Sequence, residues 1–152
     1  MPALEEKVVE DRGDYEVIQD RDGRKVLMFK GRRSGFTPEY LDHPVKDMRS
    51  WVETCKLRMD PDSKERYISL RQDVEIARKS ASEGELICQS LVGGYMYLRS
   101  SIGPSELLYR FYDEPELIHD CMETWLRLAD RMIAVVDEHL TLDELFFAED
   151  IC

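Results

Sequence analysis

Residues 113–148, DEPELIHDCMETWLRLADRMIAVVDEHLTLDELFFA, contain the strongest structural signal in the chain. Asp113 and Glu116 can form a capping box at the start of a helix, with a proline between them that suits the first turn. Apolar side chains then recur three and four residues apart, which predicts an amphipathic helix to about His139. The apolar run at 144–148 predicts a short strand after this helix.

A second apolar run lies upstream of the long helix. Residues 85–92, ELICQSLV, precede a pair of glycines and predict a buried strand. Two short helices, at 95–102 and 105–112, are expected between this strand and the long helix. The order strand, helices, strand defines a βαβ unit, in which the two strands pair in parallel through a right-handed crossover.

The N-terminal part has a different pattern. Residues 15–30 alternate between apolar and polar around an Asp-Gly pair at 22–23, which predicts a β-hairpin with a type I′ turn. Residues 36–45 contain two prolines and predict an extended loop. Two helices are expected, at 46–59 and at roughly 63–81, because a proline between them ends the first. The expected single domain comprises residues 1–152, with the hairpin at 15–30, helices at 46–81 and the βαβ unit at 85–152.

The charge of the chain excludes some classes of partner. The 152 residues carry 21 basic and 32 acidic side chains, a formal net charge of −11. This balance disfavours binding to nucleic-acid phosphates or to an anionic membrane surface. Residues 106–152 hold 13 acidic residues and three arginines. We expect this acidic part to be a solvated helix face, the alternative being a docking surface for a partner.

The sequence is typical of a soluble cytoplasmic protein. No apolar run reaches the roughly 18 residues of a membrane-spanning helix, and the first residues are charged rather than typical of a signal peptide. The four cysteines are widely spaced, and we expect them to be free thiols in a reducing compartment.

The residues that follow the first predicted strand are candidates for a site, because ligands in parallel α/β folds bind beyond the carboxyl ends of the strands. Gly93 and Gly94 can let the backbone approach a bound substrate. Tyr95 or Tyr97 can supply a catalytic hydroxyl. The alternative is a tight strand-to-helix turn with two packing tyrosines.

Two carboxylates follow the second predicted strand. Glu149 and Asp150 are adjacent, so they project to opposite sides of the strand. Glu149 can bind a cation, accept a hydrogen bond from a substrate or transfer protons, and the alternative is a solvated strand end. His119 and Cys121 lie two residues apart on a helix and therefore point in different directions. No metal site is predicted from these residues.

The chain resembles the central region of the uroporphyrinogen decarboxylase superfamily, and most closely its branch related to corrinoid-dependent methyltransferases. The resemblance rests on FKGRRSGFTPEYLDHPVKDMRSWVE at 29–53, on RMDPDSKERY at 58–67, and on the run from IGPSELLYRFYDEPELIHD at 102–120 to DELFFAEDIC at 143–152. These motifs occur in the same order and cover the chain from about residue 5 to its end.

The resemblance implies a (β/α)₈ barrel with its site at the carboxyl ends of the strands. Such a barrel typically needs about 250 residues, so we expect a partial TIM barrel, a central fragment with an inserted β-hairpin, that is inactive by itself. The decarboxylases act in porphyrin biosynthesis without a cofactor. The methyltransferase relatives use zinc to activate a thiol that takes a methyl group from a corrinoid protein.

In the intact parent, the resemblance assigns a catalytic role to Glu149 and to Tyr95 or Tyr97. Asp150, next to Glu149, is a further catalytic candidate, and substrate contacts of Gly93 and Gly94 are expected from their place at the strand end. Glu149 matches the glutamate of a Glu-Ser-His-Ala-Gly segment, whereas Asp150 replaces its serine, which weakens the case for decarboxylation. The arginine-rich substrate loop, its catalytic aspartate and the zinc ligands have no counterpart here.

The implied function is therefore a corrinoid-linked methyltransferase. The alternatives are uroporphyrinogen decarboxylation and a non-catalytic binding or dimerisation module. Zinc and a corrinoid protein are expected only for the intact parent, with no cofactor on this fragment. Homo-oligomerisation is plausible because an incomplete barrel exposes strand edges.

Overall fold

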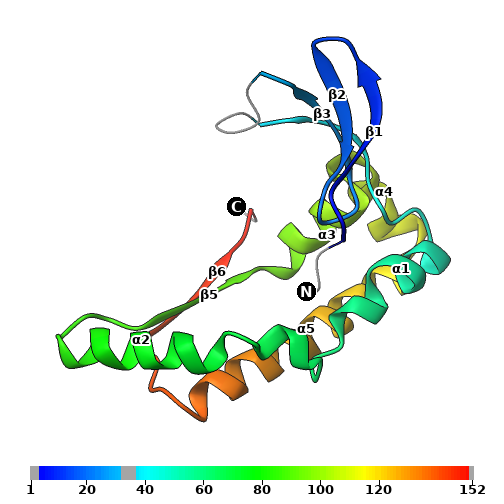
Figure 1. Ribbon diagram of the computed structural model, residues 1–152. Helices are drawn as coiled ribbons and strands as arrows, with labels where there is room; N and C mark the ends of the chain where they lie inside the picture. Colours follow the sequence, from blue (N-terminus) through cyan, green and yellow to red (C-terminus); the bar gives the residue numbers. More distant parts are fainter. Residues whose placement is uncertain (1–3, 32–36, 151–152) are drawn as a thin grey trace.

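The computed structural model describes residues 4–31 and 37–150, which form a mixed α/β structure. A four-stranded antiparallel sheet lies at one end, and a pair of parallel strands runs beside a long helix at the other (Figure 1). The mixed α/β class agrees with the sequence. The described residues do not close a barrel, because only two of their strands pair in parallel.

The antiparallel sheet is larger than the predicted hairpin. Strands β2 (Tyr15–Gln19) and β3 (Lys25–Phe29) form that hairpin, and β1 (Lys7–Arg12) and β4 (Glu39–Asp42) extend it in the order β1-β2-β3-β4. Every residue of β1 is exposed, so its sequence lacks the alternation that reveals a half-buried strand. Strand β4 lies in the segment 36–45 that was predicted to be a loop.

The turn of the hairpin also differs from its prediction. Gln19 pairs with Lys25, so the connection spans the five residues between them instead of two. A type I′ turn needs positive φ at both central residues. Gly23 has a φ of 89°, but no described non-glycine residue has a positive φ, so Asp22 does not satisfy the requirement. Asp20 closes the loop instead, because its carboxylate accepts hydrogen bonds from the N–H groups of Asp22 and Arg24.

The two predicted N-terminal helices are each divided. The first consists of α1 (Met48–Thr54) and a 3₁₀ turn (Lys56–Met59), and the second of a 3₁₀ turn (Lys64–Tyr67) and α2 (Leu70–Ser82). Helix α1 begins with a capping box in which the Asp47 carboxylate accepts a hydrogen bond from the Ser50 N–H. Such reciprocal caps satisfy the free N–H groups at a helix start.

The βαβ unit follows the predicted order closely. Strands β5 (Cys88–Val92) and β6 (Glu144–Ala148) are joined by α3 (Gly94–Ile102), α4 (Pro104–Asp113) and α5 (Pro115–Asp137). The strands pair in parallel, as expected, but no residue of β5 is buried, so the prediction of a buried strand at 85–92 is wrong on that point. The expected capping box at Asp113 is absent, because Asp113 is still part of α4 and Glu114 takes the cap position of α5 without a side-chain hydrogen bond.

A buried cluster joins α1 to the helices of the βαβ unit. Trp51 of α1 is completely buried, and its Nε1–H donates to Asp120 Oδ2 of α5 at 2.6 Å. Lys56 Nζ lies 2.6 Å from Asp120 Oδ1. Burial raises the pKa of Asp120, but the hydrogen bonds from Lys56 and Trp51 outweigh it and hold the pKa below its usual value. The apolar members of the cluster include Val45, Leu98, Ile102, Leu107, Leu117 and Cys121.

Candidate functional site

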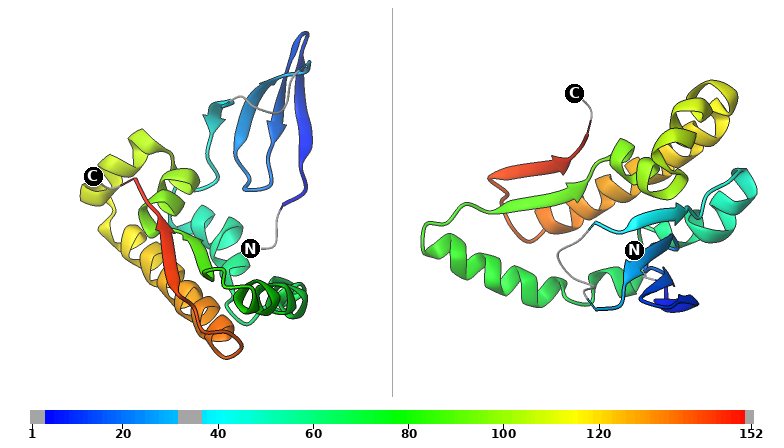
Figure 2. Two further views of the ribbon diagram at one scale, coloured as in Figure 1. Left: turned by 90° about the vertical axis from the view of Figure 1, so that its left-hand side faces the viewer. Right: turned by 90° about the horizontal axis from the view of Figure 1, so that it is seen from above.

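The carboxyl ends of β5 and β6 lie side by side at one edge of the parallel pair (Figure 2). The register pairs Cys88 with Glu144 at the start of the strands and Val92 with Ala148 at their end. The Gly93 N–H continues the contact by donating to the Ala148 carbonyl at 2.8 Å. The residues that follow the two strands therefore meet, although more than 50 residues separate them in the sequence.

Glu149 caps helix α3. Its Oε1 accepts a hydrogen bond from the Tyr95 N–H at 3.0 Å, and its Oε2 accepts one from the Met96 N–H at 3.1 Å. The first N–H groups of a helix have no partner within the helix and carry partial positive charge, so a carboxylate is stabilised there. Each Glu149 oxygen has a further lone pair with which it can accept a hydrogen bond. Glu149 is thus a positioned acceptor at the strand ends.

The two glycines allow neighbouring side chains to approach the backbone. A Cβ atom on Gly93 would lie 2.1 Å from Cδ and Oε1 of Glu149. A Cβ atom on Gly94 would lie 2.6 Å from Cε of Met122 and 3.2 Å from Cε3 of Trp125. The groups that approach both glycines are therefore parts of the protein itself, which agrees with the tight-turn interpretation of this pair.

Tyr95 and Tyr97 lie in different surroundings, because residues two apart on a helix point in different directions. The ring of Tyr95 stacks on Phe111 of α4, with 6.5 Å between the ring centroids. Tyr97 packs edge-on against Trp51 at 6.4 Å and lines a partly open cavity. Burial raises the pKa of the Tyr97 hydroxyl, which keeps it protonated. Of the two tyrosines, Tyr95 bonds to the Glu149 carboxylate, and it does so through its backbone N–H. The described contacts include no hydrogen bond from either tyrosine ring to this carboxylate.

Asp150 is also attached to α3. Its carboxylate forms an ion pair with Arg99, near the end of that helix. The two carboxylates that follow β6 are therefore anchored to the same helix, Glu149 through backbone N–H groups and Asp150 through a side chain. The structure brings Gly93, Glu149 and the start of α3 together, with Asp150 beside them.

The described residues show no cluster of metal-binding side chains. No group of three or more His, Cys, Asp or Glu side chains within residues 4–31 and 37–150 is arranged to hold a metal ion. Cys55 and Cys121 are buried in the core, and burial raises the pKa of Cys121 to about 12. Both thiols belong to the apolar core cluster.

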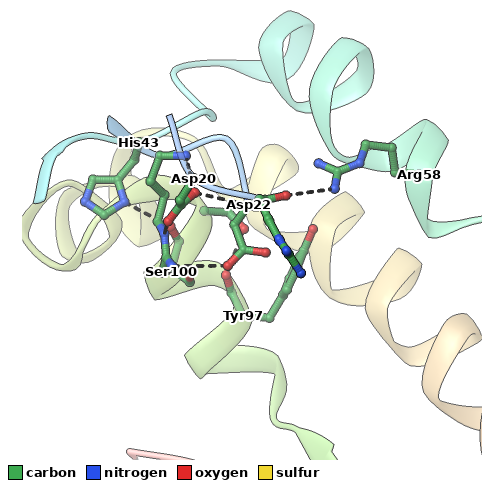
Figure 3. A network of polar contacts seen from close by, with 9 residues as sticks. Asp20, Asp22, His43, Arg58, Tyr97 and Ser100 are labelled. Carbon is green, nitrogen blue, oxygen red and sulfur yellow. Dashed lines mark hydrogen bonds and ion pairs between the residues drawn. The ribbon is translucent and has the colours of Figure 1, made fainter. Parts of the chain in front are cut away.

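A polar network joins the hairpin loop to α3, and the sequence did not indicate it (Figure 3). Arg24 Nε donates to Asp20 Oδ2 at 2.7 Å, and Arg24 Nη1 donates to Ser100 Oγ at 2.6 Å. His43 Nδ1 donates to the Ser100 carbonyl at 2.9 Å. Charged residues in a turn usually point to solvent, and Arg24 lies 76 residues from Ser100. No local signal therefore predicts this contact.

Comparison of the chain with protein-family models, with curated proteins and with solved structures found no match. Across the described ranges, no helix is long and apolar enough to cross a membrane.

The contact between Gly93 and Glu149 can be tested by a double-mutant cycle. Gly93→Ala is expected to lower the free energy of unfolding by about 1–2 kcal/mol, because the new methyl group displaces the Glu149 carboxylate and frees two N–H groups. Glu149→Ala removes the same cap. Urea denaturation should therefore show that Gly93→Ala has little further effect in the Glu149→Ala background. Additive effects of the two substitutions would contradict the contact.

Proposed function

We propose that this chain is part of a (β/α)₈ barrel of the uroporphyrinogen decarboxylase type, from the branch related to corrinoid-dependent methyltransferases. The observation that supports the proposal best is the meeting of Gly93 and Glu149 where the parallel strands β5 and β6 end. Catalytic groups of such barrels lie at this end of the strands. In an intact parent, further strands would pair with the free edges of β5 and β6.

In this proposal Glu149 binds and orients the substrate. Its carboxylate is held by the Tyr95 and Met96 N–H groups, so it needs no reorganisation to accept a hydrogen bond from a substrate donor. Beside it, the negative charge of Asp150 is paired with the positive charge of Arg99. Methyl transfer to a thiol is preferred over decarboxylation, because Asp150 stands where the resemblance places a serine in the decarboxylases. Zinc ligands and the binding surface for a corrinoid protein would come from parts of the parent beyond the described residues.

The activity test uses the complete protein encoded by the reading frame that contains these 152 residues. It is assayed with methyl-corrinoid plus a thiol, and separately with uroporphyrinogen. We expect methyl transfer, and we expect Glu149→Gln to lower kcat/KM about tenfold or more, because the amide keeps the shape but loses the charge and one acceptor.

Glu144→Gln is the matched control, since Glu144 is an exposed residue at the opposite end of β6. It should leave kcat/KM unchanged. Full activity of Glu149→Gln would refute the assigned role of Glu149. Turnover of uroporphyrinogen alone would favour the decarboxylase alternative, and turnover of neither substrate would exclude both chemistries.

One observation favours a non-catalytic binding or dimerisation module as the second candidate. The face of β5 and β6 opposite to α5 carries Val92 and Phe146, which are 55% and 51% exposed. Parallel sheets are normally covered on both faces. A stable dimer of the 152-residue chain, combined with an inactive complete protein, would support this candidate over the enzyme.

A further inference from the structure

A cavity of about 300 Å³ lies between the hairpin loop, α3, β5 and α5. Its walls include Met59, Leu91, Trp125, Ala129 and Met132. We propose that this cavity is a binding site for an uncharged aromatic molecule of two or three rings. The site is separate from the proposed role of Glu149, which is not among the residues that line it.

The walls determine the apolar character of the ligand. Most lining side chains are aliphatic, aromatic or sulfur-containing, and Ala129 on α5 and Met59 are buried. Pockets for small molecules are mostly apolar and have volumes of about 300–1,000 Å³. Met59 and Met132 contribute thioethers, which make favourable contacts with aromatic rings. Trp125 offers an aromatic surface that is held in place, because its Nε1–H donates to the Val92 carbonyl at 3.0 Å.

The two charged residues of the cavity already have partners, so they do not call for a charged ligand. The carboxylate of Asp22 lies 3.2 Å from Arg24 Nη2. Arg66 Nη2 donates to the Arg58 carbonyl at 2.9 Å, and Arg66 Nε donates to the Asp60 carbonyl at 3.3 Å. A buried charge on the ligand would have to compete with these contacts, and an unpaired buried charge is strongly unfavourable. The ligand is therefore uncharged.

The volume sets the size of the ligand. Atoms fill roughly three quarters of the space in a well-packed interior, so a cavity of about 300 Å³ holds a molecule with a van der Waals volume of roughly 220 Å³. This corresponds to two or three fused or linked rings. The cavity is partly open to solvent, so a molecule of this size can enter it from water.

The test uses N-phenyl-1-naphthylamine, an uncharged aromatic probe whose fluorescence increases in apolar surroundings. We expect saturable binding with one probe per chain. The chain has two tryptophans, so an ¹⁵N-labelled sample gives two indole signals. The Trp125 signal should shift more on titration than that of Trp51, because Trp125 lines the cavity, whereas Trp51 touches it only through its contact with Tyr97.

Ala129→Leu tests the location of the site by filling part of the cavity. It is expected to weaken probe binding about tenfold or more without lowering the thermal midpoint, because the added carbons occupy empty space. Ala134→Leu is the matched control, since Ala134 is an exposed residue of the same helix, and it should bind the probe like the unaltered protein. The proposal is overturned if the unaltered protein shows no saturable binding, or if Ala129→Leu binds the probe equally well.

Discussion

Trp51→Ala is expected to lower the free energy of unfolding by about 3–5 kcal/mol, the range typical of removing a large aromatic side chain from a core. Trp51 is completely buried and lies where α1 contacts α5. The substitution leaves a cavity beside Tyr97, in the cluster to which Leu98 also belongs. It also removes the indole N–H that donates to Asp120. Trp51→Ala therefore loses both apolar packing and a hydrogen bond.

Urea denaturation followed by far-UV circular dichroism measures this effect. Trp51→Phe retains most of the apolar volume and loses the hydrogen bond, so its cost should be clearly smaller. Tyr112→Ala is a suitable control, because Tyr112 is 89% exposed and its removal should hardly alter the midpoint. If Trp51→Ala unfolds at the urea concentration of the unaltered chain, α1 does not pack on the βαβ unit as described.

Gly103→Ala is expected to cost about 3 kcal/mol, because backbone strain and overpacking coincide at this position. Gly103 joins α3 to α4 with a φ of 102° and a ψ of 145°, a conformation largely restricted to glycine. A Cβ atom there would lie 2.9 Å from Cδ2 of His43. His43 cannot move freely, since its Nδ1 donates to the Ser100 carbonyl and its ring stacks on Tyr40.

Gly13→Ala separates the two contributions. Gly13 also has a positive φ, of 74°, but no other atom lies within 4 Å of the position that a Cβ would occupy. Its substitution should therefore show only the backbone strain, about 1 kcal/mol. Thermal and urea denaturation of both variants give the comparison. Equal costs at the two positions would show that the contact with His43 is unimportant.

The elements that could be predicted from the sequence are those with strong local signals. Pro115 and the apolar periodicity that follows it define α5, and the apolar run 144–148 coincides with β6. Strand β1 could not be predicted in this way, because all its residues are exposed and its stability comes from pairing with β2. Strand β4 was missed for a different reason, because the prolines at 38 and 44 that flank it suggested a loop.

The candidate site was predictable only in part. The rule that parallel strands end at one edge correctly brings Gly93 and Glu149 together. It does not determine where side chains on α3 point. Tyr97 was a candidate for the same site as Glu149, whereas the structure packs its ring against Trp51. The contact of Arg24 with Ser100 depends on how the hairpin packs against α3, and nothing in either segment alone encodes it.

The cap that Glu149 provides for α3 has a consequence for the order of folding. The N–H groups of Tyr95 and Met96 obtain their partner from a residue 54 and 53 positions away. The start of α3 is therefore completed only after a long loop has closed, and closing such loops is entropically slow. The meander β1–β4 joins strands that are neighbours in the sequence and requires no such closure. We therefore expect the N-terminal sheet to form early, and the strand ends that carry Gly93 and Glu149 to be among the last parts to reach their native geometry.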